Sequence, residues 1–281
     1  MLASAATATA TAFAWAWHRD RDRRQAAERL AAATLETLLN AVDANDEVTG
    51  QHMRRTAAYA LCLAEALGLG DQERRKVERI ALFHDIGKLH AALFDIVHDD
   101  KRLSDEERAR IATHPERGAE VLDPLGAFYA ELPDGVLAHH ERWDGTGYPR
   151  GLKGTAIPLY ARVVAIADTF DAITHSRRYH AGEGPDRGLR LIAEGRGTQF
   201  DPRLVDLFLS DTVQANVRRT FQQSQQAPQA LQPSRPRKGG ERRADAAESA
   251  VPNVQFRWRA PSAVAEANGS RDDEEPPPPA A

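Results

Sequence analysis

The strongest constraint on the fold of this chain is a pair of short strings that are rich in metal-binding side chains. Residues 84–88 read His-Asp-Ile-Gly-Lys, and residues 139–149 read His-His-Glu-Arg-Trp-Asp-Gly-Thr-Gly-Tyr-Pro. Imidazole and carboxylate groups bind divalent cations, and soluble proteins seldom concentrate them in short ordered blocks without a metal. The two strings therefore predict a dinuclear metal site and a fold that brings both strings to it.

The composition sets the broad class of protein. The 281 residues are enough for one large domain or two small ones. The formal net charge is -4, so no overall basic character indicates a nucleic-acid polymer as a partner. Cys62 is the single cysteine, which excludes an internal disulfide and fits a reducing compartment such as the cytoplasm. It lies in an apolar helical pattern, and we expect it to pack as a small core residue.

Residues 1–24 form an apolar and then charged N-terminal segment. Residues 2–17 carry no charge and end in Phe-Ala-Trp-Ala-Trp, and a stretch rich in Arg and Asp follows. Aromatic residues followed by arginines resemble the cytoplasmic edge of a membrane helix. The stretch is nevertheless shorter than the roughly 20 apolar residues that span a bilayer. Two interpretations stay open, namely a tether to the inner membrane and an unstructured start.

Apolar residues recur at spacings of three to five along most of the chain, which predicts an all-α fold. Asp71 and Asp201 are expected N-caps, and Ser104 with Glu107 forms a capping-box pattern. Pro115 is expected at the first position of its helix, which leaves His114 at the cap. The predicted helices span residues 25–44, 54–69, 71–85, a segment from 104, a segment from 115, 134–140, 158–176, 184–194 and 202–209.

Three regions follow from these patterns. Residues 1–24 are the N-terminal segment, residues 25–221 are the predicted helical domain, and residues 222–281 are predicted to be a disordered tail, rich in Gln, Pro and charge. Within the tail, residues 254–259 are either a short linear binding element or a chance group of aromatics. The apolar stripe on residues 25–42 could support a homodimer or could pack on the domain.

The residue types themselves indicate which chemistry the strings could carry. His84 and Asp85 offer an imidazole and a carboxylate, and a carboxylate can bridge two cations about 3.5–4 Å apart. If helical, His139 and His140 project about 100° apart, so each could face a different metal. The mixture of nitrogen and oxygen donors suits iron, manganese or zinc. Further candidates lie in or next to helical segments: His52, His114 and Asp168.

A histidine taken alone on a helix is more often a core or surface group than a ligand. The chain has ten histidines, so the pattern as a whole carries the prediction. The five outside the proposed site are His18, His90, His98, His175 and His180.

The chain resembles the HD-GYP family, a branch of the HD-domain superfamily of metal-dependent phosphohydrolases. The resemblance covers roughly residues 38–209 and implies an all-α, HD-type helical bundle with a dinuclear metal site in its core. The motifs that carry it are residues 49–52 (Thr-Gly-Gln-His), 84–88, 103–107 (Leu-Ser-Asp-Glu-Glu), His114-Pro115, 139–149, 167–172 (Ala-Asp-Thr-Phe-Asp-Ala), Arg177 with Tyr179, and 200–202 (Phe-Asp-Pro).

The resemblance implies two divalent metal ions, iron or alternatively manganese, with Asp85 as the bridge. Some family members hold a third metal through a glutamate four residues before the first histidine. That position is Val48 here, so we expect two metals rather than three. The implied ligands are His52, His84, Asp85, His114, His139, His140 and Asp168.

The resemblance also implies residues that bind the substrate. Lys88 matches a lysine that holds a substrate phosphate, and with Asp85 it is a catalytic candidate. Arg177 matches a phosphate-binding arginine. His180 stands where a second basic residue is usual, which could weaken phosphate binding or make it depend on pH. Asp171 lies one turn after Asp168 and is either a partner that orients a ligand imidazole or a surface carboxylate.

The turn that ends in Gly-Tyr-Pro has two interpretations. In the family this loop is linked to contacts with GGDEF-domain proteins, which makes Arg142, Asp144 and Tyr148 candidates for such an interface. Alternatively, the turn only positions the helices on either side of it.

The implied reaction is the hydrolysis of cyclic di-GMP to linear pGpG, and further to GMP, in bacterial second-messenger signalling. The resemblance selects this substrate, since the ligands alone support only phosphoester hydrolysis. Two alternatives stay open: a phosphohydrolase that acts on another nucleotide, and a non-catalytic receptor for cyclic di-GMP or a scaffold for a GGDEF partner. The loop at residues 96–101 departs from the family pattern and keeps the second alternative open. Residues 1–37 are too few for a sensory domain, so we expect input from the N-terminal helix, a tether, a partner or substrate supply.

Overall fold

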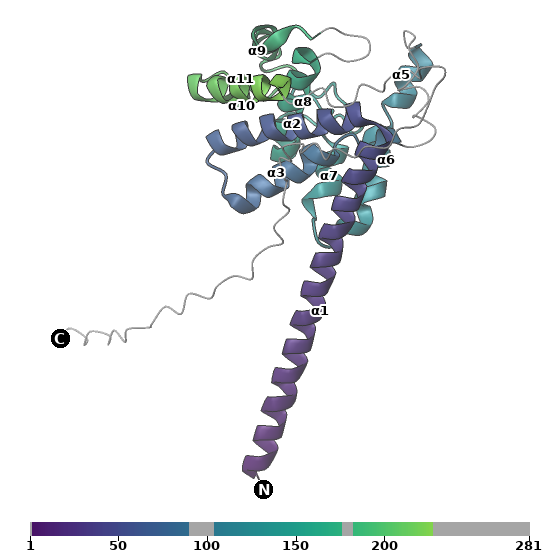
Figure 1. Ribbon diagram of the computed structural model, residues 1–281, viewed down its shortest axis with the longest axis vertical. Coiled ribbons are helices and arrows are strands. Elements are labelled where there is room, and N and C mark those ends of the chain that lie inside the picture. Colours follow the sequence, from purple (N-terminus) through teal and green to yellow (C-terminus); the bar gives the residue numbers. More distant parts are fainter. Residues whose placement is uncertain (1, 90–103, 176–181, 227–281) are drawn as a thin grey trace, which may run out of the picture. The chain divides into compact units, whose positions relative to one another are not determined.

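The computed structural model describes residues 2–89, 104–175 and 182–226 of the chain. Every regular element in these ranges is a helix, and the β-structure there consists of one isolated bridge between Arg196 and Phe200. The predicted all-α class is confirmed (Figure 1). The chain divides into two units, and the second, which begins at Ala33, contains all seven predicted ligands.

The helices follow one another along the described chain. They are α1 (Leu2–Asn45), α2 (Glu47–Ala66), α3 (Asp71–Phe83), η1 (Ile86–Leu89), α5 (Asp105–Ile111), α6 (His114–Leu122), η2 (Asp123–Leu125), α7 (Glu131–Leu137), η3 (Gly154–Ala156), α8 (Leu159–Thr174), α9 (Gly184–Glu194), α10 (Pro202–Phe208) and α11 (Asp211–Gln226).

Both ends of the described helical part extend beyond the predicted boundaries. Helix α1 begins at Leu2, so the segment at residues 2–24 is helical and continuous with the helix predicted from residue 25. Helix α11 was not predicted, and it ends at Gln226, beyond the boundary expected at residue 221. No helix in the described ranges is both long enough and apolar enough to cross a membrane.

Helix α2 begins at Glu47 rather than Arg54 because Asp46 caps it. The Asp46 side chain accepts hydrogen bonds from the backbone N–H groups of Val48 and Thr49, which otherwise have no partner in the first turn. The capping box predicted at Ser104 and Glu107 is confirmed at the start of α5, and the predicted N-cap Asp201 caps α10.

Three other predicted helix ends were wrong. Gly70, and not Asp71, is the N-cap of α3, and Asp71 lies in the first turn, where its charge favours the helix dipole. Helix α6 begins at His114, so Pro115 is its second residue. Helix α7 ends at Leu137, and His139 and His140 therefore follow the helix instead of lying in it.

The core forms where α2 packs against α3, α8 and α11. Tyr59 of α2 and Phe170 of α8 meet edge to face, with ring centroids 4.9 Å apart, and Phe170 meets Phe208 of α10 in the same way at 5.5 Å. All three rings are fully buried, so their apolar surface contributes strongly to stability. Cys62 of α2 is partly buried beside this core.

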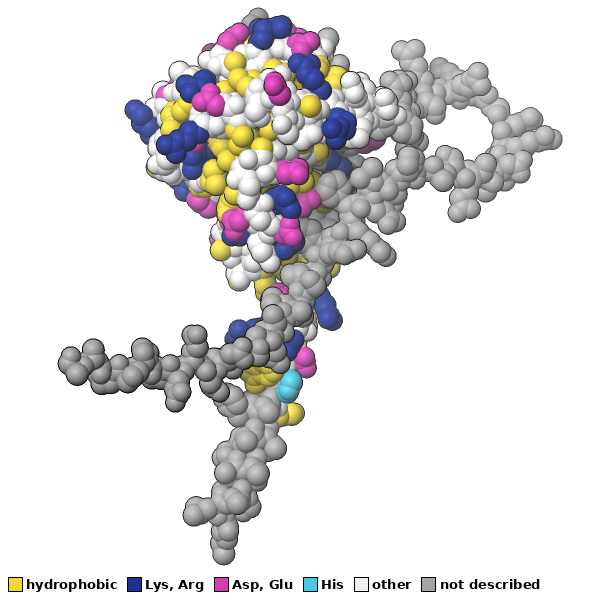
Figure 2. Space-filling model, turned by 90° about the vertical axis from the view of Figure 1, so that its left-hand side faces the viewer, with side chains coloured by type: hydrophobic (Ala, Val, Ile, Leu, Met, Phe, Trp, Pro, Cys, Tyr) yellow, Lys and Arg dark blue, Asp and Glu magenta, His cyan; other side chains and the backbone are white. Residues whose placement is uncertain are grey.

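The surface carries charges of both signs. Figure 2 shows one face of the molecule, on which Lys and Arg side chains are interspersed with Asp and Glu side chains. The described part of that face has a mixed charge pattern, in line with the small net charge of the chain.

Gly87 brings the His-Asp-Ile-Gly-Lys string against α6. A Cβ atom on Gly87 would lie 2.1 Å from the backbone oxygen of His114 and 2.7 Å from the backbone nitrogen of Gly118. Neither backbone atom can move aside without shifting α6. A residue with no side chain is therefore required where η1 crosses α6, and this crossing places Asp85 next to His114.

We predict that Gly87→Ala lowers the free energy of unfolding of the metal-free protein by about 2–3 kcal/mol, since overpacking a tight contact typically costs that much. Urea denaturation measures it. Gly70→Ala is the control, because a Cβ there meets no atom within 4 Å, and its cost should stay below about 1 kcal/mol. Equal costs for the two variants would contradict the close crossing of η1 and α6.

Candidate metal centre

Five elements of the second unit bring the seven predicted ligands to one place. Helix α2 carries His52, and His84 and Asp85 are the two residues that follow α3. His114 is the first residue of α6, His139 and His140 follow α7, and Asp168 lies in α8. Five of these side chains are buried, and His140 and Asp168 are partly buried.

The ligand atoms fall into two groups that share one carboxylate. In the first group, ligand atoms of His52, His84 and Asp85 all lie within 4.8 Å of one another. In the second, those of Asp85, His114, His139 and His140 do so. Asp85 therefore lies between two sets of imidazoles, which is the arrangement that a bridging ligand requires.

Asp168 joins the first group. Its Oδ1 atom lies 3.1 Å from Nε2 of His52 and 3.7 Å from Nε2 of His84. Each half of the cluster thus has a carboxylate in reach, and all seven predicted ligands are brought together.

The hydrogen bonds of the histidines aim one ring nitrogen of each at the cluster. Nδ1 of His84, His114 and His139 bonds in each case to the backbone oxygen three residues earlier, at 2.8, 2.8 and 2.5 Å. Because a carbonyl oxygen only accepts, each Nδ1 carries a proton, which leaves Nε2 as the ring nitrogen that faces the cluster. Metal-binding histidines are held in this way.

Two buried atoms of the cluster have no hydrogen-bond partner within the described part of the protein. Nε2 of His84 is buried without a hydrogen-bond partner, and so is Oδ1 of Asp85, which lies 3.2 Å from Nε2 of His114 without normal hydrogen-bond geometry. Buried polar atoms nearly always have partners. A divalent cation would satisfy both atoms, and the cluster of histidines and aspartates is able to bind one.

The charges of the cluster prepare it for a cation. Burial and the neighbouring His140 hold the pKa of His139 well below its usual range, and burial and His114 lower the pKa of His140 to about 3. Both rings are therefore neutral near pH 7, as metal ligands must be. Burial works against a charged His84, but Asp85 and Asp168 outweigh it and raise the pKa of His84 to about 10. That proton supplies the positive charge that a bound cation would replace.

Asp171 holds His52 in place. It is fully buried, and it accepts a hydrogen bond of 2.6 Å from Nδ1 of His52. Arg55 donates to both of its oxygens, at 2.7 and 3.0 Å. The interpretation of Asp171 as a surface carboxylate is wrong, and its contact with His52 supports the interpretation as the partner of a ligand imidazole. Arg55 was missed, although its position one turn after His52 places it on the same helix face.

The Gly-Tyr-Pro turn is packed against the cluster. The Tyr148 ring stacks on His140 with centroids 4.9 Å apart, and the Tyr148–Pro149 peptide bond is cis. A Cβ on Gly147 would lie 2.3 Å from the backbone nitrogen of Arg142, so the turn closes tightly only with glycine there.

Glu141 was also missed by the sequence analysis. This carboxylate is 4% exposed and accepts hydrogen bonds from the backbone N–H groups of Arg150, at 2.8 Å, and Leu152, at 2.9 Å. It therefore ties the end of the turn back to the histidine pair. Its position directly after the two histidines was the available signal.

The remaining candidate residues have varied surroundings. Lys88 Nζ lies 2.6 Å from Oδ2 of Asp85, and its side chain is 20% exposed. Arg142 donates to Asp144 at 3.1 Å and to Thr146 at 3.0 Å. Residues 96–101 and 254–259 and the candidates Arg177 and His180 lie outside the described residues.

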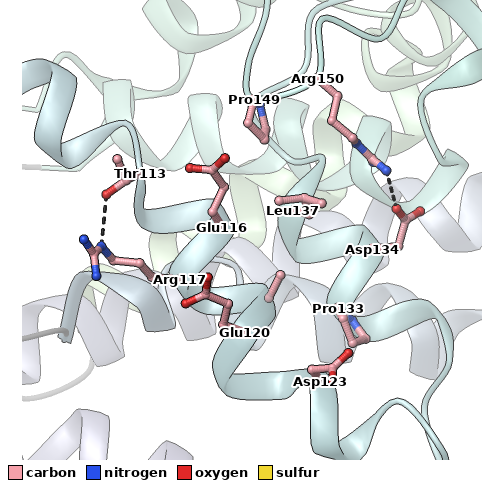
Figure 3. A pocket seen from close by; sticks show the side chains of 11 residues that line it. Thr113, Glu116, Arg117, Glu120, Asp123, Pro133, Asp134, Leu137, Pro149 and Arg150 are labelled. Carbon is pink, nitrogen blue, oxygen red and sulfur yellow. Dashed lines mark hydrogen bonds and ion pairs between the residues drawn. The ribbon is translucent and has the colours of Figure 1, made fainter.

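The two residues after Tyr148 help to line a cavity of about 920 Å³ (Figure 3). Helices α6 and α7 line it together with Pro149 and Arg150, and Arg150 bonds Asp134 across its edge at 2.7 Å. None of the seven predicted ligands lines this cavity. The turn thus contacts the cluster through Tyr148 and the cavity through the two residues that follow.

The sequence profile of the HD domain family matches residues 36–204. The chain belongs to the HD domain family. The match covers the segments that carry all seven predicted ligands, so the family predicted from the histidine strings is confirmed.

Three relatives of this HD domain are similar over about 60% of the chain. The cyclic di-GMP phosphodiesterase response regulator RpfG of Xanthomonas campestris is 38% identical over 64% of this chain and 48% of its own length. The 3'3'-cGAMP-specific phosphodiesterase 2 of Vibrio cholerae is 36% identical over 61% of this chain and 33% of its own length. A cyclic di-GMP phosphodiesterase of the same organism is 37% identical over 60% of this chain and 37% of its own length. The chain therefore spans half or less of the length of these relatives.

The lowered pKa of His140 predicts how the metal-free HD domain responds to acid. In the unfolded chain the imidazole takes up its proton near pH 6.5, whereas in the fold the pKa of His140 is about 3. The unfolded state therefore binds more protons between these values, and stability falls as the pH falls through this window. We expect His140→Gln to make this loss less steep in urea denaturation between pH 7 and pH 4.

The control is His18→Gln, which changes an exposed histidine and should leave the slope as it is in the unaltered protein. A wild-type slope in His140→Gln would show that His140 is not held neutral by its surroundings.

Proposed function

We propose that this HD domain is a metal-dependent phosphodiesterase that hydrolyses cyclic di-GMP to pGpG, and further to GMP, in bacterial second-messenger signalling. The observation that carries the proposal is the sharing of Asp85 between two groups of buried imidazoles. The activities named for the relatives RpfG and the Vibrio phosphodiesterase support the substrate.

Two divalent ions, iron or alternatively manganese, would be held by the cluster. Asp85 would bridge them, with His52, His84 and Asp168 on one side and His114, His139 and His140 on the other. When bound, such ions lower the pKa of water and stabilise charge on phosphoryl oxygens. Val48 stands where a third metal would need a carboxylate, so we propose two metals.

The chain's own residues would bind and orient the cyclic dinucleotide. An ammonium group has three donors, and Lys88 uses one on Asp85 at the edge of the cluster, which leaves it placed to donate to a phosphate oxygen as well. It would thereby stabilise negative charge that develops on phosphorus oxygens. Arg177 and His180 are proposed as further phosphate-binding residues from their positions in the sequence.

We also propose a protein partner, a surface for self-association and a cellular location. We propose that Arg142, Asp144 and Tyr148 contact a GGDEF-domain protein, since Tyr148 is both 36% exposed and stacked on His140. Self-association would use the apolar stripe on residues 25–42 of α1, on which Leu30 is exposed. The proposed location is the cytoplasm, with the N-terminus as the place of any tether to the inner membrane.

One further substrate is favoured by a specific observation. A relative at 36% identity is named as specific for 3'3'-cGAMP, another cyclic dinucleotide. Cleavage of both dinucleotides should therefore be measured side by side.

We predict that the metal-loaded chain cleaves cyclic di-GMP and that Asp85→Asn abolishes this cleavage. Lys88→Met should lower kcat by about 10²–10³, as expected when one charge-stabilising donor is removed. The matched control is Lys76→Met, which removes a lysine paired with Glu73 on α3 and should leave kcat unchanged. Product formation is followed by chromatography.

Three results would overturn this assignment in different ways. Cleavage of 3'3'-cGAMP alone would show that this dinucleotide, and not cyclic di-GMP, is the substrate. Cleavage of other nucleotides alone would make the protein a different phosphohydrolase. Tight binding of cyclic di-GMP by the fully metallated chain, without product, would make it a receptor.

A further inference from the structure

A chain of buried and part-buried polar contacts leads away from the proposed metal site to the last described helix. It begins at His52, passes through Asp171 and His175, and ends at Ser224 of α11. Residues in this chain come from α2, the end of α8 and α11, so the contacts join segments far apart in the sequence.

Asp171 is the branch point of this chain. Besides His52 and Arg55, it faces Nδ1 of His175, which lies 3.1 Å from its Oδ1 atom. Its oxygens are thus contacted by three side chains from different positions, and Asp171 itself has no exposure to solvent. A carboxylate held by several donors has little freedom to rotate, so it fixes the ring of His52 through the 2.6 Å bond to Nδ1.

His175 connects this carboxylate to α11. The residue lies directly after α8, is 6% exposed, and its Nε2 atom lies 2.8 Å from the hydroxyl of Ser224. The His175 ring also packs on Phe221, with centroids 5.0 Å apart. Ser224 in turn donates to the backbone oxygen of Phe221 at 2.7 Å, which fixes its hydroxyl against the helix.

The position of α11 therefore bears on the proposed metal site although it supplies none of the seven ligands. Helix α11 packs on α2, the helix that carries His52. It thus reaches His52 by two routes, through apolar packing and through the polar contacts of His175. Only the second route depends on the Ser224 hydroxyl, which makes the two routes separable by experiment.

We propose that His175 and Ser224 are positioning residues that hold Asp171, and through it His52, in the orientation that binds metal. The proposal rests on the proposed function only in taking His52 as a metal ligand. It makes α11 a determinant of metal affinity. A purely structural role for the two residues would change stability and leave metal affinity as it is.

The test is a titration of the full-length, metal-free chain with Co²⁺, followed by the visible absorption of the bound ion. Removing a group that orients a ligand typically weakens metal binding by about 10–100-fold. We expect Ser224→Ala, three contacts away from His52, to raise the Kd for Co²⁺ by roughly 3–10-fold, and His175→Phe to raise it at least as much. Ser224→Thr keeps the hydroxyl and should stay within about twofold of the unaltered chain.

The matched control is Ser210→Ala. The Ser210 hydroxyl donates to the backbone oxygen of Leu207 at 2.7 Å, as that of Ser224 does to Phe221, and it has no bond to His175. Ser210→Ala should leave the Kd within about twofold. The Tm of each metal-free variant, measured in parallel, records effects on the fold.

Two outcomes overturn the inference. The first is an unchanged Kd in Ser224→Ala, whatever its Tm, while the unaltered chain binds Co²⁺. The second is an equal rise in Kd for Ser210→Ala and Ser224→Ala. Because binding is measured without substrate, a chain that binds Co²⁺ as expected and cleaves no dinucleotide would refute the phosphodiesterase and leave the inference standing.

Discussion

The buried carboxylate of Asp85 is the constraint on which the rest of the structure depends. An ionised carboxylate that is 2% exposed is costly unless charges and donors surround it. Burial opposes its ionisation, but Lys88 and His84 hold its pKa well below the usual range. The crossing of η1 and α6 at Gly87 brings His114 to the same carboxylate. Both the close packing at Gly87 and the surrounding charges therefore act on Asp85.

Residues 139–149 supply two imidazoles next to Asp85 and a turn that packs against them. His139 and His140 face Asp85 from the end of α7, and the next nine residues form a turn that returns to them. Glu141 ties the end of this turn through two backbone N–H groups, and Tyr148 covers His140. The turn therefore shields one side of the histidine cluster, while its last residues line a separate cavity.

Local signals in the sequence predict most of the helices, and the seven predicted ligands, which lie in short motifs, do come together in the fold. Local signals do not predict features that depend on contacts between distant parts of the chain. The N-cap of α2 at Asp46 could have been predicted from the sequence, but it was missed. Helix α11 buries only Val213 and Val217, so its Gln-rich sequence resembles a polar tail. The partners of Asp171 join positions as far as 119 residues apart, which no local pattern can reveal. Likewise, the orientation of His139 depends on where α7 ends.

The most direct test of this account is the number of metal ions that the chain binds. Equilibrium dialysis of the metal-free protein against Mn²⁺, with the metal content of the protein measured at saturation, gives this number. The shared position of Asp85 predicts two ions per chain, and at most one in Asp85→Asn. An absence of saturable binding, or the same number of ions in both proteins, would contradict a dinuclear centre bridged by Asp85.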